Sequence, residues 1–590
     1  MSNLSRKNRY HNAKLVLCID IGTTFTAASY CLVPPTDKET IKFQEINRWP
    51  KQNHPDAKVP SIIYYDKEGK PRLRGAEIED EESKMEAEIS DWRRAEWWKM
   101  LLRPSYFSLP EGFSAAALPP RVTVEKAFED QMAYVMENVR RFINTMYPDG
   151  VDLWNTLHQS MVLVLTTPNG WDGLQQHKMR EASVKSGLIK PEKRNYVRFV
   201  SEGEAAIHYC IDNTPKTLLK IGSTILVCDI GGGTIDLGVY KLDNLEPISL
   251  AEVGPPSCYL AGGVYVDYEA KIFIRDKLSG SKWGTNDDID KAAQCFEKGV
   301  KRLFTGKEDS RFLNLNGSNA SDESRGIVRG RLKMKRADLI KIFEPSIRVI
   351  RNALMEALTT STSRIDQIFV VGGFADSPYV YSQIEEFFKG HKIPVCKPND
   401  IMSKAISHGG LRWHFDSGVQ VRIAKLHYGA ETTVLYDPKD AEMVGRAKFQ
   451  NCRGEWRVRN AWKTIVPKNT RIRGEDEHRE IFHIEFEDPS DLEVELELFA
   501  YRLLEPPTFL RNKDGSLVEG IIHLGTVKGN LRRCYEFSKL KVSKAGKQYK
   551  ILEYQICLYF GDTELKANLR WKENGKTVVG DAIISYDVHL

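Results

Sequence analysis

The strongest constraint on the fold is an apolar run that ends in an acidic residue and is followed by three glycines. Residues 225–240 read ILVCDIGGGTIDLGVY, in which the first apolar run leads to Asp229 and the second begins after Gly231–Gly233. The β-branched runs predict two buried strands, and the glycines allow a sharp turn between them. Glycine N–H groups can approach an anion closely, and the carboxylate of Asp229 can hold a hard cation directly or through water. The pattern suits phosphate and Mg²⁺, although an ordinary hairpin explains a single occurrence equally well.

The same pattern occurs a second time near the N-terminus. Residues 15–30 read LVLCIDIGTTFTAASY, so an apolar run again ends in an acidic residue, Asp20, and is followed by glycine, two threonines and a second run. Two similar hairpins that lie far apart in the chain predict a duplicated fold that holds one ligand from two sides.

A third glycine motif follows at residues 368–378, which read IFVVGGFADSP. The apolar run predicts a strand, and Ser377-Pro378 predicts the start of a helix, since proline suits the first helical turn. A helix N-terminus or a glycine turn can receive the phosphates of a nucleotide.

Together and in this order, the three motifs resemble those of the 70-kDa heat-shock protein family within the actin/sugar-kinase/heat-shock ATPase superfamily. The chain looks closest to divergent members outside the main chaperone group. The resemblance implies an α/β fold, with a two-lobed actin-like ATPase domain and a duplicated ribonuclease-H-like core at residues 15–415. A polar tail would precede it at 1–14, and a β-rich domain would follow at 416–590.

The β-rich domain is also predicted by the sequence pattern itself. From about Phe415, helical periodicity gives way to short alternating segments, which are typical of a β-sandwich or barrel. The predicted strands are residues 419–425, 432–436, 480–486, 492–501, 520–524, 549–559 and 565–571. Residues 465–472 are similar to a strand entry of the family's substrate-binding β-domain, whose helical lid we expect this chain to lack.

Other stretches give local expectations. Residues 122–146 have the periodicity of a long amphipathic helix, and residues 77–100 are charged and helix-prone. Residues 309–331 are rich in Asn, Ser and Gly and predict an exposed loop, whereas 332–358 predict a helix with a kink at Pro345.

The resemblance implies roles for individual residues. ATP or ADP would lie between two lobes, and Mg²⁺ would be held through water by Asp20 and Asp229. Glu202, Asp229 and Thr234 would orient the attacking water. Lys99 is the positional candidate for the lysine that approaches the γ-phosphate in the family, which makes the catalytic set Asp20, Lys99, Glu202, Asp229 and Thr234. The nucleotide would contact Gly22, Thr23, Thr24, Phe25, Gly231, Gly232, Gly233, Gly262, Gly263, Lys301, Arg302, Gly372, Gly373, Phe374 and Asp376.

Several positions depart from the family pattern. The residues around Lys99 match poorly, so a solvated lysine on an amphipathic helix is an equal alternative. Gly203 and Glu204 replace the family's Pro and Thr, and we interpret Glu204 as an acid favoured by a helix N-terminus. Val264 replaces an acidic residue after the double glycine.

The residues expected to contact adenosine also depart from the family pattern. Glu297 stands one residue further from the Lys-Arg pair than the corresponding family Glu. Asp376 stands in place of an Arg that stacks on adenine, and Phe374 in place of a small hydroxyl residue. Phe374 could offer a stacking face to adenine, or it could belong to the core.

Bulk properties narrow the functional class. The net charge is +5 over 590 residues, which does not favour a nucleic-acid partner. The ten cysteines are scattered without a CxxC pair, as in a reducing compartment. Residues 1–14 lack the apolar core of a secretory signal, and no apolar run is long enough to cross a membrane. We expect a cytoplasmic protein, or one that is also nuclear, without a membrane partner.

Three functional hypotheses follow. The first is an ATP-dependent chaperone-like protein, a slow ATPase whose nucleotide state controls a polypeptide-binding β-domain, with polypeptide clients and co-chaperones as partners. The second is a nucleotide-regulated interaction protein with little or no hydrolysis and one dedicated protein partner. The third is a small-molecule kinase on the same fold, which the β-rich C-terminal part disfavours.

Overall fold

The structure is a computed structural model, and its strands and helices fall into two compact units. It describes residues 13–33, 41–52, 54–110, 112–113, 117–171, 173–315, 320–398, 402–416, 419–473, 476–487, 492–560, 565–573, 575–580 and 583–585. The N-terminal unit comprises the chain up to Trp171 and Lys178–Val419, and the C-terminal unit comprises residues 172–177 and the chain from Gln420 onward. The predicted tail at 1–14 lies almost wholly outside the described residues.

The first sheet of the N-terminal unit is built around the N-terminal hairpin. Strand β1 pairs antiparallel with β2, from Lys14 opposite Val33 to Ile21 opposite Thr26, and on its other side it pairs parallel with β8. The strand order is β3-β2-β1-β8-β9, with β4 also paired to β2. The bounds are β1 Lys14–Ile21, β2 Phe25–Val33, β3 Phe43–Glu45, β4 Lys58–Pro60, β8 Val162–Thr167 and β9 Val197–Ser201.

The second sheet repeats this arrangement. Strand β10 pairs antiparallel with β11 and parallel with β16, which gives the order β17-β16-β10-β11-β12 within this unit. The bounds are β10 Thr224–Ile230, β11 Ile235–Leu245, β12 Ile248–Tyr259, β16 Gln367–Val371 and β17 Val395–Cys396. In each sheet the hairpin lies beside two parallel strands. The predicted two-lobed α/β fold with a duplicated core is therefore confirmed, and we call the two sheets with their helices the first and second lobes.

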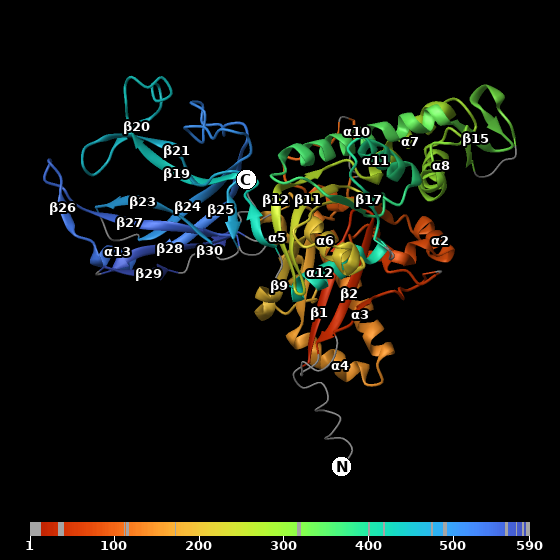
Figure 1. Ribbon diagram of the computed structural model, residues 1–590, viewed down its shortest axis with the longest axis horizontal. Coiled ribbons are helices and arrows are strands. Elements are labelled where there is room, and N and C mark those ends of the chain that lie inside the picture. The colour runs from red at the N-terminus through yellow and green to blue at the C-terminus, as the bar shows by residue number, and fades with distance from the viewer. Residues whose placement is uncertain are drawn as a thin grey trace, which may run out of the picture. The chain divides into compact units, whose positions relative to one another are not determined.

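Two helices lie between the sheets, α6 (Glu202–Asp212) and α12 (Ala405–Phe415) (Figure 1). Their apolar faces pack against both sheets in one buried cluster. Helix α12 approaches α6 and β1 closely because it carries two glycines. A Cβ on Gly409 would lie 1.8 Å from the carbonyl oxygen of Ala205 on α6, and one on Gly410 would lie 2.4 Å from Cys18 Sγ on β1. Larger residues at these positions would push the lobes apart.

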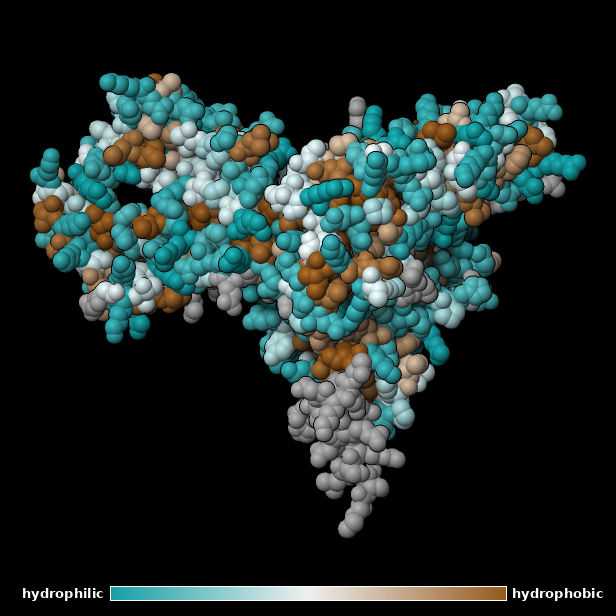
Figure 2. Space-filling model, viewed as in Figure 1, coloured by the Kyte–Doolittle hydropathy of each residue, from teal (hydrophilic) through white to brown (hydrophobic). Residues whose placement is uncertain are grey.

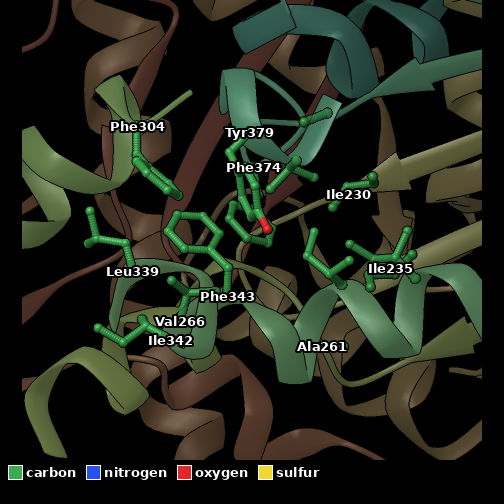
Figure 3. Packing of buried hydrophobic residues seen from close by; sticks show 14 of the residues in the cluster. Ile230, Ile235, Ala261, Val266, Phe304, Leu339, Ile342, Phe343, Phe374 and Tyr379 are labelled. Carbon is green, nitrogen blue, oxygen red and sulfur yellow. The ribbon is translucent and has the colours of Figure 1, made fainter. Parts of the chain in front are cut away.

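Other helices cover the outer faces. In the first lobe, α3 (Val124–Met146) forms the long amphipathic helix that the sequence predicts and packs on the first sheet. In the second lobe, α7 (Gly263–Leu278), α10 (Arg336–Thr360) and α11 (Pro378–Lys389) bury the second core. Figure 3 shows the rings of Phe304, Phe343, Phe374 and Tyr379 gathered in this core.

The remaining elements of this unit are short, apart from α5 and α8. They are β5 Ile63–Tyr65, β6 Pro71–Arg74, α4 Gly150–Leu157, η3 His158–Ser160, α5 Gly173–Lys185, η4 Pro191–Tyr196, η5 Lys216–Leu218, α8 Asn286–Cys295, η6 Phe296–Val300, α9 Lys301–Leu303, η7 Glu323–Arg325 and η8 Met402–Lys404.

The prediction of helix over residues 77–100 is only partly correct. The chain forms η1 Gly75–Glu79 and α2 Glu81–Ile89, then the strand β7 Arg93–Ala95 and the 3₁₀ helix η2 Trp98–Leu102. Asp91, just after α2, has a positive φ of 51°, which is incompatible with a continued helix, and β7 pairs with β5. Trp97, just before η2, also has a positive φ, of 56°. The charged residues favoured a helix locally, but tertiary pairing determined the fold of this stretch.

The predicted exposed loop at 309–331 is wrong in its described part. It contains β13 Ser310–Asn314 and β14 Ile327–Val328, which form a small sheet with β15 Arg331–Lys335. Leu313, Ile327 and Leu332 are buried and anchor this sheet in the second core. Helix α10 consequently begins at Arg336 rather than at 332, and it contains Pro345.

The C-terminal unit contains two β-sheets with a shared core, so the predicted β-rich region is confirmed. The strand orders are β20-β21-β19-β24-β25-β30 and β23-β27-β28-β29, with β26 paired to β27. Both sheets contribute to one apolar cluster, as expected for a sandwich. The bounds are β18 Val419–Ile423, β19 His427–Leu435, β20 Lys448–Gln450, β21 Trp456–Val466, β22 Arg471–Arg473, β23 Glu477–Phe486, β24 Glu493–Tyr501, β25 Ile521–Asn530, α13 Arg532–Phe537, β26 Leu540–Val542, β27 Gln548–Tyr559, β28 Lys566–Glu573, β29 Lys576–Gly580 and β30 Ile583–Ser585.

The surface is mainly hydrophilic on the visible face of each unit, with apolar residues in scattered patches (Figure 2). Within the described part of the chain, none of the helices combines the length and the apolar character needed to cross a bilayer.

The contact between α6 and α12 can be tested by substitution. We expect Gly409→Ala to lower the free energy of unfolding by about 3 kcal/mol, because the new methyl group would overlap the Ala205 carbonyl. Gly390→Ala is the control, since a Cβ there meets nothing within 4 Å and φ is −65°. Its effect should be neutral or stabilising by about 0.5 kcal/mol. Urea unfolding measures both, and an equal effect of the two substitutions would contradict the packing.

Candidate functional site

The turns of the two hairpins have the same backbone geometry. In the first, the N–H of Gly22 donates to the carbonyl of Phe25 at 2.9 Å. In the second, the N–H of Gly231 donates to the carbonyl of Thr234, also at 2.9 Å. The sequence similarity between the hairpins therefore corresponds to two equivalent four-residue turns.

The two turns face each other across the lobes. A Cβ on Gly232 would lie 2.3 Å from Thr24 Oγ1, and a Cβ on Gly233 would lie 2.3 Å from Thr23 Oγ1. Glycine is needed here because any side chain would collide with the threonines of the opposite turn. The structure thus brings together two turns that lie about two hundred residues apart in the chain.

The double glycine after β12 joins the second turn. Helix α7 begins at Gly263 with Gly262 as its N-cap, and the N–H groups of Gly263 and Val264 donate to the carbonyls of Gly231 and Gly232 at 3.1 and 2.9 Å. The positive end of the α7 dipole consequently lies at the glycine turn, where it favours negative charge.

The third glycine motif, at residues 368–378, lies beside Asp229 on the side of β10 that faces away from β11. Strand β16 runs parallel to β10 with Val371 opposite Asp229, and the following Gly372 has a φ of +95°. A Cβ on Gly372 would lie 2.3 Å from Asp229 Oδ1. Gly372 therefore touches the acidic residue at the centre of the motif, whereas Gly373 is exposed.

A group of buried carboxylates lies at the ends of the hairpin strands and at the start of α6: Asp20, Glu202, Asp229 and Asp236 are each less than 9% exposed. Asp229 and Asp236 are direct partners in the β10–β11 register. Thr166 Oγ1 donates to Asp20 Oδ1 at 2.9 Å, and the backbone N–H of Asn169 donates to Asp236 Oδ1 at 2.6 Å.

Lys99 reaches this group from the first lobe. Its side chain is 3% exposed, and Nζ donates to Glu202 Oε1 at 2.7 Å while lying 5.4 Å from the ring centre of Trp171. The alternative of a solvated lysine on an amphipathic helix is therefore wrong. Lys99 lies on the 3₁₀ helix η2, which is fixed by a hydrogen bond from Trp98 Nε1 to the carbonyl of Ser61.

The group carries more negative charge than Lys99 can balance. Burial, together with the charges of Asp236 and Asp20, raises the pKa of Glu202 to about 8 despite its ion pair. Burial and the neighbouring carboxylates also raise the pKa of Asp229 well above its usual range. Burial disfavours the charged form of Lys99, but the surrounding carboxylates outweigh it and raise the pKa of its ammonium. The site is therefore suited to take up a proton or a further cation.

A cation here would be held mainly through water. Among the described residues there is no set of three or more His, Cys, Asp or Glu side chains placed to hold a metal ion directly. Mg²⁺ keeps several of its waters and takes few carboxylates, so Asp20 and Asp229 fit such an ion.

The predicted adenosine side contains an adaptation that spacing alone did not reveal. Lys301 Nζ donates to Asp267 Oδ2 of α7 at 2.5 Å. Between α8 and Lys301, residues 296–300 form a π-helical turn, which accommodates one extra residue in a helix. Burial and the charge of Glu297 raise the pKa of Asp267 to about 6, while Lys301 lowers it. Arg302 is exposed.

Other predicted contacts lie elsewhere. The ring of Phe374 is 5% exposed and stacks on Phe343 at 6.3 Å with an interplanar angle of 21°, so it belongs to the core (Figure 3). Asp376 is exposed and lies 3.5 Å from Lys397 Nζ. Glu204 is buried and accepts a hydrogen bond from Trp413 Nε1 at 2.8 Å, which gives it a structural partner on α12.

Three residues of the site were missed by motif reasoning: Thr166, Asn169 and Asp236. Asp236 is a carboxylate inside an otherwise apolar strand, and that exception was the signal available in the sequence. Thr166 and Asn169 lie at the end of β8 and just after it, and only the parallel pairing of β8 with β1 brings them to the site.

Comparison with known proteins places this geometry in a family context. A family model described as Hsp70 protein matches residues 156–402. The chain is 26% identical over 282 residues to the chaperone protein DnaK of Anaplasma marginale. The aligned region covers 46% of this chain and 41% of that protein. The chain is 23% identical over 502 residues to heat shock 70 kDa protein 12A of Mus musculus, covering 70% and 71% respectively. It is 25% identical over 244 residues to the chaperone protein HscA of Buchnera aphidicola, covering 41% and 35%. The matches to DnaK and HscA thus span less than half of those relatives.

The charge imbalance predicts a pH dependence of stability. Glu202 has an ordinary pKa of 4.5 and a folded pKa of about 8, so it binds its proton more tightly in the folded protein than in the unfolded chain. Its contribution to the free energy of unfolding is present at low pH and is lost as the pH rises from about 4.5 through about 8. We expect urea midpoints of the nucleotide-free protein to fall across this range, and Glu202→Gln to reduce the fall.

Glu192→Gln is the matched control, because Glu192 is exposed on η4. It should leave the pH profile unchanged. Identical profiles for Glu202→Gln and Glu192→Gln would contradict the assignment of the shift to Glu202.

Proposed function

Since the chain is a divergent member of the Hsp70 family, we propose that it is a nucleotide-binding, chaperone-like protein that binds Mg-ATP between the lobes of its N-terminal unit. One observation carries this proposal: the two equivalent turns meet at Thr23, Thr24, Gly232 and Gly233, beside buried carboxylates with unbalanced charge. In this assignment residues 15–415 form the nucleotide-binding domain and residues 416–590 a polypeptide-binding β-domain.

The phosphates would bind at the opposed turns. The threonine hydroxyls of the first turn and the glycine backbone of the second offer donors without a bulky side chain between them. The N-terminus of α7 adds a positive dipole end at the second turn. When bound, Mg²⁺ would neutralise phosphate charge, and Asp20 and Asp229 would hold its water shell.

Hydrolysis would depend on positioning. Glu202 and Thr234 lie in the group of buried side chains and can orient a water molecule, and Lys99 supplies a fixed positive charge beside Glu202. Phosphoryl transfer needs mainly alignment and charge neutralisation, so these residues support a slow ATPase.

The partner of the C-terminal unit would be a polypeptide, either varied unfolded clients, with co-chaperones assisting, or one dedicated protein. A dedicated partner with little hydrolysis is favoured by the core position of Phe374 and the exposure of Asp376, since both leave the adenine contact unlike the family pattern. We place the protein in the cytoplasm, where the scattered free cysteines are stable.

The nucleotide site can be tested at Asp229. We expect Asp229→Asn to weaken Mg-ATP binding at least tenfold in calorimetry, because it removes a charge that holds the cation's water shell. The same change should leave the nucleotide-free protein as stable or more stable, because it removes one of several buried carboxylates. Asp243→Asn, at an exposed position on β11, is the control and should bind Mg-ATP like the wild type. Unchanged binding by Asp229→Asn would overturn the site.

The chaperone and interaction hypotheses are separated by phosphate release. A chaperone-like ATPase should release phosphate well below about 10 per second, and unfolded peptides should accelerate it. Thr234→Ala should slow the release, whereas Thr359→Ala, at an exposed position on α10, should not. Equal release by wild type and Thr234→Ala, without an effect of peptide, would favour the dedicated interaction protein.

A further inference from the structure

The two lobes also meet through an apolar cluster that the proposed nucleotide chemistry does not use. We call it the aromatic clasp. Its first-lobe members are Trp97, Met100, Leu109 and Phe113, and its second-lobe members are Leu260, Val264, Tyr265 and Tyr268. Met100, Phe113, Val264 and Tyr265 are each 6% exposed or less.

Phe113 is the centre of the clasp. Its ring centre lies 4.6 Å from that of Tyr265 and 5.1 Å from that of Tyr268, both on α7 of the second lobe. On its other side it stacks on Trp97 of the first lobe at 5.9 Å. The hydroxyl of Tyr268 also donates to the carbonyl of Gly112, so a hydrogen bond crosses the lobes beside the rings.

The clasp adjoins Lys99 in the first lobe and the double glycine at the start of α7 in the second lobe. Met100 directly follows Lys99 on η2, and Val264 directly follows Gly263 at the start of α7. Separating Met100 from Val264 would therefore move η2, which carries Lys99, relative to the start of α7, which is hydrogen-bonded to the second turn. We expect opening of the clasp to disturb the site.

The apolar side chains of the aromatic clasp suit a contact between the lobes that opens slowly. Opening would expose apolar side chains to water, and each aromatic pair contributes roughly two- to tenfold to an equilibrium constant beyond the area it buries. Val264 has no charge that would retain water between the lobes.

We propose that the aromatic clasp holds the lobes closed over bound nucleotide, positions Lys99 and Gly263 around the phosphates, and limits the rate at which nucleotide leaves. The effect on nucleotide rests on the proposed function, whereas the closing contact between the lobes does not. Phe113, Tyr265 and Tyr268 act as positioning residues, since none of them touches the carboxylates.

The test uses Phe113→Ala and the matched control Phe107→Ala. Phe107 is an aromatic residue of the same segment, but its ring packs within the first lobe, where a Cβ on Gly170 would lie 2.3 Å from it. A fluorescent ADP analogue is bound to the full chain and displaced by excess ADP in a stopped-flow instrument. We expect Phe113→Ala to speed release about tenfold and Tyr268→Phe about threefold, in line with lost aromatic and hydrogen-bond contacts. Phe107→Ala should match the wild type, and Phe113→Leu should restore part of the slow release. Release from Phe113→Ala at the wild-type rate would overturn the proposal.

A second measurement does not depend on nucleotide. Hydrogen exchange of the nucleotide-free protein should accelerate in Phe113→Ala on both sides of the clasp, at residues 98–102 and at residues 261–267. In Phe107→Ala the second-lobe segment should stay protected. If neither variant changes the exchange of residues 261–267, the clasp does not join the lobes and the proposal fails. If exchange responds while no chain binds the analogue, the clasp stands as a closing contact and the proposed nucleotide function fails.

Discussion

The burial of several carboxylates in one place is the constraint on which the rest of the N-terminal unit depends. Asp20, Glu202, Asp229 and Asp236 lie at the ends of hairpin strands and at a helix start, nearly out of contact with water. Burial and neighbouring negative charges raise the pKa of a carboxylate, as they do for Glu202 and Asp229. The ion pair with Lys99 offsets part of this repulsion. The remainder makes the site a receptor for positive charge, and a hydrated divalent cation would meet that requirement.

The backbone around these carboxylates brings the turns of the two lobes together without exposing the core. Equivalent turns from two duplicated hairpins approach to the point where only glycine fits against Thr23 and Thr24. Behind them, α6 and α12 cross at Gly409 and hold the sheets at a fixed separation. Helix α6 begins at Glu202, so the same packing that sets the lobe spacing also sets the position of a site carboxylate.

The local sequence pattern was sufficient to predict the strands and turns of the site. It was not sufficient to predict which side chains from distant parts of the chain contact one another. The two hairpins, Asp20, Asp229 and the glycine turns followed from short runs, because a strand, an acid and a glycine turn are encoded by neighbouring residues. The burial of Lys99 could not be predicted, since it depends on η2 meeting α6, more than one hundred residues later in the chain. The core position of Phe374 depends on Phe343 of α10. The spacing of Glu297 differs by one residue from the family pattern, and the π-helical turn at Phe296–Val300, which spacing alone did not reveal, contains this residue. The strands at 310–314 and 327–328 were hidden by polar residues because only their inward positions, such as Leu313 and Ile327, carry the apolar signal.

Helix η2 links the chemistry of the site to the closing of the lobes. Neighbouring residues on this short helix have different tasks: Lys99 pairs with Glu202, and Met100 packs in the aromatic clasp against Val264. A motion that opens the clasp would move the backbone of η2, which carries both residues. A bound cation would supply positive charge to the carboxylates, and its phosphates would meet the hydrogen-bond donors of both turns, so we expect bound nucleotide to favour the closed arrangement. In the proposed function, nucleotide binding and lobe closure would be coupled, and residues such as Phe113, far from the carboxylates in the chain, would shift that coupling by changing the stability of the closed contact alone.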